Sequence, residues 1–366
     1  MKKIFFLFLG LIFLSACSSN RNAVEAIRDG GEWFLGNQDE SFIYYQYDTE
    51  TDTHPDKHHS AREFGALWSI TKLAGFLNDS RYNDLALRGW EHFSKTFVRD
   101  EVNDFTYVNI TPSKIKLSYN AFATLVLLEL NMDGKDAVLE QLAKGILYAQ
   151  ADSGELDTFY YSDRATGTDY YPGQALLALM SLYEAGGNED YLDAVAKALP
   201  YYSETYWAGN PNTAFVPWQT QAFYKYYMAT GSQEAVDFVF AMNDFMIDHF
   251  AEDEACESFD TDSGIVMAVY VEGMNKAYML ADGLGDEARK TCYGNFIREG
   301  SEAVMALQDF NESLMRRFFG SSPSVSGDGA AFGGFHGSLR DFSMQVDRNQ
   351  HAVMALMGAY ELGLVK

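Results

Sequence analysis

Hydrophobic residues recur at helical spacing along most of the chain, in pairs of segments separated by short polar turns. The clearest copy runs from Tyr170 to Tyr202: an apolar first segment, a small polar turn, and a tyrosine that opens an amphipathic second segment. A near twin runs from Ala61 to Phe93. Such helix-turn-helix units cannot bury their apolar faces alone and must stack on neighbours. The pattern therefore predicts an all-α repeat architecture.

Twelve helices are predicted from this periodicity. They span residues 22–37, 60–78, 81–98, 117–131, 134–151, 171–186, 188–206, 216–230, 232–250, 263–283, 286–308 and 347–363. The turns inside pairs carry breakers and capping residues, as in Gly186-Gly187-Asn188. Twelve helices make six hairpins only if the last helix pairs with the first. Because an open solenoid needs polar end caps and both terminal helices are apolar, we expect a closed (α/α)6 toroid.

The N-terminus has the pattern of an export signal. Lys2 and Lys3 precede a short apolar run, and Leu14-Ser15-Ala16-Cys17 resembles the bacterial lipoprotein signal box. We therefore expect a signal peptide at 1–16, a lipidated Cys17 with its tether at 17–21, and one toroid domain at 22–366. Ser18 after Cys17 suggests sorting to an outer membrane, facing the periplasm. The alternative is an ordinary secreted protein with an incidental cysteine.

Net charge limits the range of partners. The chain carries a formal charge of −25, which repels nucleic acid and anionic lipid head groups, although solubility alone also explains it. No phosphate-cradling loop, dinucleotide fingerprint, nucleophile elbow or zinc spacing is present in the sequence. We therefore expect no nucleic-acid partner, no cofactor and no metal. One long loop is predicted, from Gly320 to Gly334.

Two cysteines follow the signal region, and an exported chain could join them in a disulfide. Cys292 lies in a predicted helix that folds back on the helix before it, whereas Cys256 precedes that earlier helix. Antiparallel packing at 1.5 Å per residue would leave the two roughly 20 Å apart, beyond the reach of a disulfide. The sequence therefore predicts two unpaired thiols.

Several segments resemble a known superfamily. They are Tyr171-Pro172-Gly173-Gln174 with the leucines that follow, Val271-Glu272-Gly273, and Asp347-x-x-Gln350-His351. They are similar to the six-hairpin glycosidase-like proteins, which include unsaturated glucuronyl hydrolases, N-acylglucosamine 2-epimerases and the C-terminal domain of glucuronyl C5-epimerases. The resemblance implies the (α/α)6 toroid and activity on carbohydrate. It does not specify the reaction, because fold alone does not imply function.

The ligand site of a helical toroid is expected where the connections between pairs meet the starts of the inner helices, since helix N-termini there point donors inward. Nine residues near these starts are candidates for substrate binding: Arg62, Lys116, Tyr119, Asn120, Tyr171, Gln174, Trp218, Gln219 and Gln350. Tyrosine and tryptophan rings suit sugar faces, and the amides and cations suit hydroxyls. Tyr44-Tyr45-x-Tyr47 is a further aromatic cluster suited to stacking. Helix capping and core packing are the structural alternatives.

Five residues are candidates for acid/base catalysis: His59, Glu63, Glu272, Asp347 and His351. A histidine beside a carboxylate can shuttle a proton, and Asp347 and His351 lie four residues apart on one helix face. Because a glycosidase needs two carboxylates facing one bond, Glu272 and Asp347 form the predicted pair.

Structural roles for the same residues stay open. Asp347 could cap its helix and His351 could be a satisfied core histidine. Glu272 follows an apolar run, so it is either used, with a raised pKa, or paired with Arg62, Lys116 or Arg340. Two functions follow. The first is a lipid-anchored protein that hydrolyses or epimerises an oligosaccharide or cell-envelope polysaccharide. The alternative is a non-enzymatic lipoprotein that binds glycan or assists polysaccharide assembly and export.

Overall fold

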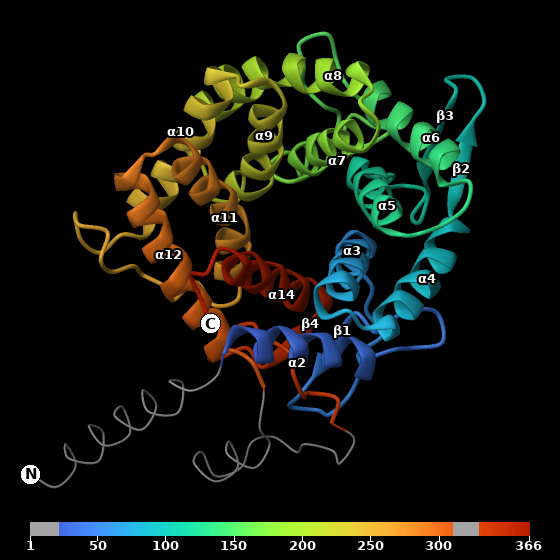
Figure 1. Ribbon diagram of the computed structural model, residues 1–366. Helices are drawn as coiled ribbons and strands as arrows, with labels where there is room; N and C mark the ends of the chain where they lie inside the picture. Colours follow the sequence, from blue (N-terminus) through green and yellow to red (C-terminus); the bar gives the residue numbers. More distant parts are fainter. Residues whose placement is uncertain (1–21, 310–328) are drawn as a thin grey trace, which may run out of the picture.

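The computed structural model describes residues 22–309 and 329–366, and within these ranges the chain folds as two concentric rings of helices (Figure 1). The inner ring consists of α3 (Ser60–Leu77), α5 (Leu117–Glu129), α7 (Tyr171–Gly186), α9 (Val216–Thr230), α11 (Val266–Leu284) and α14 (Val346–Glu361). The outer ring consists of α2 (Ala23–Gly36), α4 (Ser80–Ser94), α6 (Lys135–Tyr148), α8 (Glu189–Pro200), α10 (Gln233–Phe250) and α12 (Glu287–Ala306). A π-helical segment, η1 (Tyr201–Trp207), extends α8. The predicted all-α fold is confirmed.

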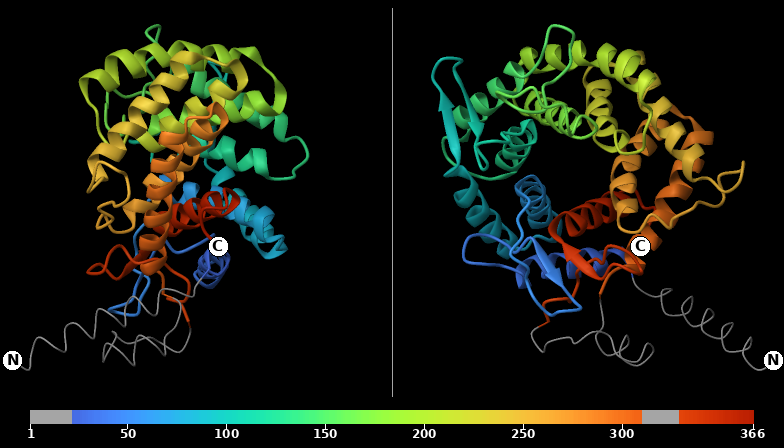
Figure 2. Two further views of the ribbon diagram at one scale, coloured as in Figure 1. Left: turned by 60° about the vertical axis from the view of Figure 1, so that its left-hand side comes forward. Right: turned by 180° about the vertical axis from the view of Figure 1, so that it is seen from behind.

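Ring closure depends on the last helix. Each inner helix packs against the next, and α14 packs against both α11 and α3 while α2 covers its outer side. Asn349 Nδ2 donates to the carbonyl of Gly30 at 2.7 Å, and the backbone of Ala23 bonds to that of Lys366. The two further views show the same closed ring (Figure 2). The predicted pairing of the last helix with the first is therefore confirmed.

Turns within the hairpins are formed by residues that adopt left-handed backbone geometry. Gly187 (φ 68°) ends α7 and Gly231 (φ 70°) ends α9. The next helix then begins at a side-chain cap, Asn188 for α8 and Ser232 for α10. These short turns all lie at one end of the toroid, here called the turn end. The longer connections lead into the inner helices at the other end, here called the connection end.

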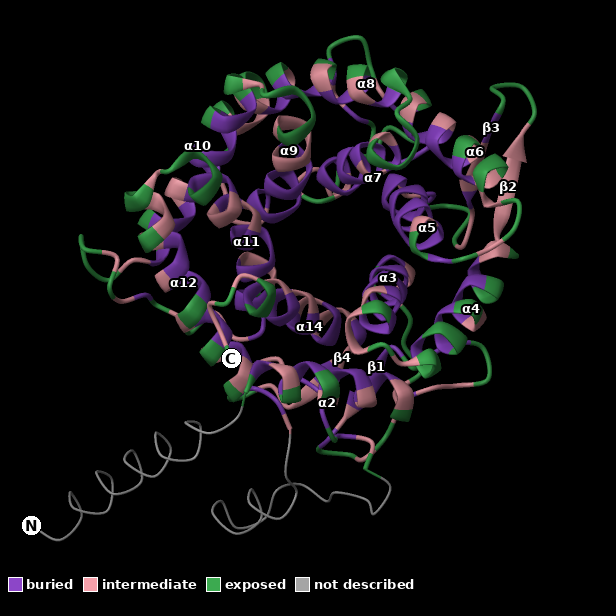
Figure 3. Ribbon diagram, in the orientation of Figure 1, coloured by how far each residue is buried: buried purple, intermediate pink, exposed green. Residues whose placement is uncertain are grey.

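Inner and outer helices differ in burial (Figure 3). In α5, every residue from 117 to 127 is buried, because one face packs on the outer ring and the other on inner neighbours. Outer helices such as α4 and α8 have one buried face and one exposed face. This difference explains why the first helix of the clearest predicted hairpin, 171–186, is apolar over most of its length.

Two short ribbons were not predicted. β1 (Gln46–Asp48) pairs antiparallel with β4 (Ser343–Gln345), so the first long connection is tied to the last. β2 (Phe97–Asp100) pairs antiparallel with β3 (Phe105–Val108). The helix expected over 81–98 therefore ends at Ser94, because the aromatic and β-branched residues that follow prefer extended backbone. The lipidation site at Cys17 and most of the loop expected at Gly320–Gly334 lie outside the described residues.

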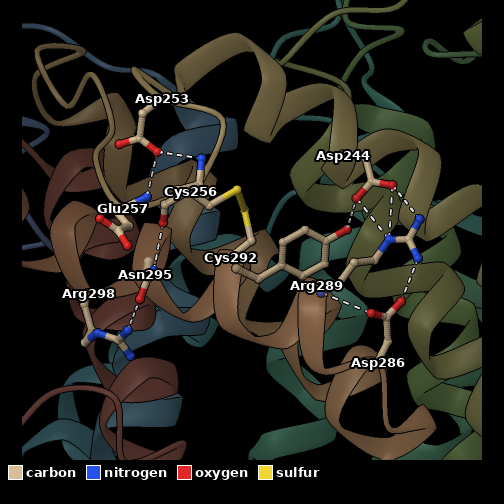
Figure 4. The surroundings of a disulfide bond; sticks show 11 residues. Asp244, Asp253, Cys256, Glu257, Asp286, Arg289, Cys292, Asn295 and Arg298 are labelled. Carbon is tan, nitrogen blue, oxygen red and sulfur yellow. Dashed lines mark hydrogen bonds and ion pairs between the residues drawn. A yellow bond between two sulfur atoms is a disulfide. The ribbon is translucent and has the colours of Figure 1, made fainter.

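The prediction of two unpaired thiols was wrong, because Cys256 and Cys292 form a disulfide with Cα atoms 5.1 Å apart (Figure 4). The expectation treated the chain before α11 as continuing away from the helix pair. Instead this connection folds back along α12, where Asn295 Nδ2 donates to the carbonyl of Cys256 at 2.7 Å. Glu299 of α12 also accepts from the backbone of Phe259, at 3.1 Å.

The disulfide should stabilise the connection that leads into α11. The bridge spans 36 residues, so we expect the double variant Cys256→Ser/Cys292→Ser to lose about 2–4 kcal/mol of unfolding free energy through greater freedom of the unfolded chain. Denaturant unfolding with and without reductant measures this. Reductant should lower the stability of the native protein and leave that of the double variant unchanged. Two free thiols titrated in the unreduced, denatured protein would contradict the assignment.

Candidate functional site

Arg62 organises the connection end. From the first turn of α3, its Nη1 lies 3.2 Å from Oδ2 of Asp347, in the first turn of α14. The same nitrogen donates to the hydroxyl of Tyr45 at 2.7 Å and to Oε1 of Gln345 at 3.2 Å. The Arg62 side chain is 44% exposed and Asp347 is 17% exposed. A charged network half open to solvent therefore joins the first inner helix to the last.

Two half-buried residues, Lys116 and Tyr171, lie beside the buried Tyr119 at the same end of the toroid. Lys116 precedes α5, and its Nζ lies 5.6 Å from the centroid of the Tyr119 ring and 5.8 Å from that of Tyr171. Burial lowers the pKa of Lys116, and the nearby charges of Lys114 and Arg62 lower it further. Burial raises the pKa of Tyr119 to about 12, so its hydroxyl stays protonated. This group offers hydrogen-bond donors beside aromatic rings, a combination that suits polyhydroxylated ligands.

The expected partnership of His59 with Glu63 was wrong, because the neighbouring histidine takes that place. His58 Nδ1 lies 3.0 Å from Glu63 Oε1, whereas His59 donates only its backbone N–H, at 3.4 Å. Burial raises the pKa of Glu63, and the His58 contact opposes the rise. The His59 ring stacks near Tyr45, with centroids 6.3 Å apart. Burial lowers the pKa of His59, helped by Lys116 and Arg62, which favours its neutral form.

A second histidine and carboxylate pair lies deeper in the ring. His351 Nδ1, one turn below Asp347 on α14, lies 2.7 Å from Oε2 of Glu272 on α11. Glu272 is 5% exposed and also accepts from Gln221 Nε2 at 3.4 Å. His351 is therefore oriented by Glu272 and not by Asp347, and Glu272 is not paired with Arg62, Lys116 or Arg340. Of the alternatives left open for Glu272, the ion pair with a cation from another hairpin is not the one found, because α11 and α14 are neighbours in the inner ring and bring Glu272 to His351.

An aromatic layer fills the centre of the ring at the depth of His351. The Trp218 ring lies 6.1 Å from Trp68, 5.6 Å from Phe122 and 6.0 Å from His351. Because α9 and α3 stand on opposite sides of the inner ring, the contact between the two tryptophans crosses its centre. A cavity of about 730 Å³ lies on the turn-end side of this layer, with Trp68 and Glu272 among its lining residues. We had expected the ligand funnel only at the connection end.

The predicted amides are all buried. Asn120 is a structural residue: it accepts from the backbone of Val108 at 3.2 Å and donates to the carbonyls of Thr106 and Leu142 at 2.8 and 3.1 Å. It holds the β2–β3 ribbon and α6 against α5, so its proposed bond to a sugar hydroxyl is corrected. Gln174 is 6% exposed, Gln219 is 0% exposed and Gln350 is 2% exposed. These three glutamines are therefore buried, unlike Arg62 in the network with Asp347.

The structure adds residues that sequence reasoning did not select for the site. Tyr45 belongs to an aromatic cluster that sequence reasoning noted without giving it a partner. His58 was passed over in favour of its neighbour, and Gln345 reaches the site through the β1–β4 ribbon. Nothing in local spacing indicates that ribbon, because its strands are separated by most of the chain. Among the described residues, no group of three or more His, Cys, Asp or Glu side chains could hold a metal ion.

No protein-family model matches the chain, and no curated protein matches it. Several solved structures do match the chain. The family 76 glycoside hydrolase of Salegentibacter sp. HEL1_6, an α-1,6-mannanase, is 12% identical with a TM-score of 0.67, over 93% of this chain and 100% of that one. A D-mannose isomerase is 10% identical with a TM-score of 0.64, over 93% and 97%. Cellobiose 2-epimerase from Bacillus thermoamylovorans B4167 is 11% identical with a TM-score of 0.59, over 89% and 95%.

At these identities the comparison shows the fold. The chain has the (α/α)6 toroid fold that its sequence resemblance implied. No helix in the described ranges combines the length and apolar character needed to cross a bilayer.

The structural role of Asn120 is testable. Replacement by Ala removes a buried acceptor and two donated bonds, so we expect Asn120→Ala to lower the unfolding free energy by about 2–3 kcal/mol. Lys116→Gln, at the exposed network one turn away, should change it by less than about 0.5 kcal/mol. Thermal and denaturant unfolding measure both. Unchanged stability in Asn120→Ala would contradict the structural role and would favour a ligand contact instead.

Proposed function

We propose that the protein binds an oligosaccharide at its connection end and epimerises or isomerises the sugar unit that reaches His351. The observation that carries the proposal is the His351–Glu272 contact of 2.7 Å beneath the Arg62–Asp347 network. The shared fold supports it, because the matching structures include a mannose isomerase and a cellobiose epimerase. The donors and rings around Lys116 supply contacts that suit sugar hydroxyls and faces.

Proton transfer is the chemistry that this arrangement favours. Glu272 engages Nδ1 of His351, which leaves Nε2 as the nitrogen able to exchange a proton with a ligand. In an open-chain sugar, Nε2 takes the proton from the carbon beside the carbonyl, and the C–H electron pair passes into an enediolate. Return of a proton to the opposite face of that carbon completes epimerisation. Return to the neighbouring carbon, with transfer of the hydroxyl proton from one enediolate oxygen to the other, completes isomerisation. Arg62 is placed to stabilise the enediolate charge.

Hydrolysis is less well supported. A glycosidase needs two carboxyl groups facing one bond, but Asp347 is held by Arg62, Glu63 by His58 and Glu272 by His351. An inactive variant of the Salegentibacter mannanase has two successive aspartates replaced by asparagine, and it was solved with α-1,6-mannotriose. The present sequence contains no two adjacent aspartates. The predicted catalytic pair of Glu272 and Asp347 is therefore replaced here by His351 with Glu272.

Non-enzymatic glycan binding is the second candidate. Two observations favour it: the aromatic layer closes the ring just below the site, and Gln174, which has no acid/base capacity, stands at the start of α7. In this case the protein would hold a cell-envelope glycan for assembly or export. The same exposed network would bind the ligand, and no product would form.

A lipid anchor at Cys17, in the outer membrane and facing the periplasm, completes the proposal. The Cys256–Cys292 disulfide supports an oxidising compartment. The first described helix begins at the turn end, where the backbone of Ala23 bonds to that of Lys366. An anchor just before it would place the turn end toward the membrane and the connection end toward soluble or cell-envelope glycan.

Catalysis is tested with mannobiose and cellobiose in D2O. We expect deuterium at the carbon beside the carbonyl and a new isomer, without new reducing ends. His351→Ala should lower the rate by about 10²–10⁴-fold, the usual contribution of a positioned acid/base group. His92→Ala, an exposed histidine on α4, is the matched control and should retain full activity. New reducing ends would indicate hydrolysis, and an unaffected His351→Ala variant would contradict the assignment.

Binding is tested separately from turnover. Arg62→Gln removes the charge that joins Asp347, Tyr45 and Gln345, so we expect affinity for α-1,6-mannotriose to fall by about tenfold or more. Arg99→Gln, which removes an arginine paired with Asp104 on the β2–β3 ribbon, should bind normally. Isothermal titration measures both. Normal binding by Arg62→Gln would place the glycan elsewhere, while binding without isotope exchange in the native protein would favour the non-enzymatic function.

A further inference from the structure

The turn end of the toroid contains a cavity whose interior the proposed function does not use, although one lining residue, Glu272, also contacts His351. Its volume is about 730 Å³, and residues from all six inner helices line it. This volume lies within the range of about 300–1,000 Å³ that is usual for small-molecule pockets. The aromatic layer of Trp68, Phe122 and Trp218 stands between this cavity and the connection end.

The cavity wall carries lysines and glutamates from neighbouring helices. Lys72 of α3 pairs with Glu129 of α5, and Lys225 of α9 pairs with Glu184 of α7. In each pair, the lysine and the glutamate neutralise each other's charge across two adjacent helices. Their side chains fix charged donors and acceptors around the wall.

Lys276 of α11 is the exception. Within the described parts of the chain it forms no ion pair; its Nζ lies 3.7 Å from Met279 Sδ and 5.9 Å from the centroid of the Tyr224 ring. Burial lowers the pKa of Lys276, and repulsion from Lys225 adds to the effect. Glu361 and Glu184 act on this ammonium from beyond ion-pair distance, against Lys225 and Lys72. Among the described residues no oxygen accepts a hydrogen bond from Lys276 Nζ, although a half-buried ammonium normally has such acceptors.

The inner part of the cavity combines apolar side chains with buried polar ones, which include Gln221 and Glu272. Leu125, Leu177 and Met354 form the apolar part. Trp68 and Asn275 also line it, and Trp68 Nε1 and Asn275 Oδ1 are buried without a hydrogen-bond partner among the residues described. Buried polar atoms usually have partners. A ligand in the cavity could complete both: an acceptor oxygen would bond to Trp68 Nε1, and a hydroxyl would donate to Asn275 Oδ1.

We propose that this cavity binds a polyhydroxylated monocarboxylate of about monosaccharide size, with its carboxylate on Lys276. The hydroxyls would meet Asn275 and the glutamates, and the apolar face of the ligand would lie against Trp68 and the neighbouring aliphatic side chains. Lys276 is the lysine of this wall without a direct ion-pair partner among the described residues, and a ligand carboxylate would form a charge-assisted hydrogen bond with it. The site goes beyond the function proposed for the connection end and is separated from it by the aromatic layer.

Isothermal titration of the full chain with D-glucuronate, D-glucose and acetate tests the site. We expect D-glucuronate to bind. Glucose lacks the carboxylate and acetate lacks the hydroxyls, so each should bind at least about tenfold more weakly than D-glucuronate. Lys276→Gln and Lys276→Met should each weaken D-glucuronate binding by about tenfold or more. Thermal unfolding of both variants establishes that they are folded. The control Lys144→Gln removes a lysine of α6 that is ion-paired with Glu140 and Asp104, and should bind normally.

The two ends of the toroid are distinguished by crossed variants. Arg62→Gln should bind D-glucuronate normally, and Lys276→Gln should bind α-1,6-mannotriose normally. The proposal is overturned if the native protein does not bind D-glucuronate, if acetate or glucose binds as tightly, or if both Lys276 variants bind at native strength. Loss of D-glucuronate binding in Arg62→Gln alone would assign that ligand to the connection end and would also overturn it.

Discussion

Closure of the inner ring through α14 is the constraint on which the rest of the structure depends. This helix enters last and must fit between α11 and α3 with α2 behind it. Close approach is possible because Gly65 and Gly358 leave room where a Cβ would collide with Gln350 and Asn275. The same closure brings Asp347 to Arg62 and His351 to Glu272. The candidate site therefore exists only when the two ends of the chain have met.

The aromatic layer divides the toroid into two chemically different ends. On one side, Arg62 and the half-buried Lys116 present donors toward solvent, with Tyr45 and Tyr119 buried beside them. On the other, Lys276 stands in a cavity lined by ion pairs and aliphatic side chains. Glu272 belongs to both, because it bonds to His351 and also lines the cavity. Its carboxylate thus connects the two ends directly.

Local patterns predicted the helices well and the contacts between distant segments poorly. Helices such as α7 and α9 begin and end where periodicity and glycine turns indicate. The disulfide could not be predicted because it depends on how the connection before α11 folds back. The partners of Glu63 and Glu272 depend on side-chain direction and on which helices adjoin, which spacing does not define. Asn120 looked like a ligand contact because its bonds go to the backbone of segments far from it in sequence.

A crystal structure with α-1,6-mannotriose bound tests the central claim most directly. The account predicts the glycan at the connection end, in contact with Arg62 and Lys116, with its terminal unit nearest His351 Nε2. Density confined to the turn-end cavity, or on the outer surface with the Arg62–Asp347 network untouched, would contradict it.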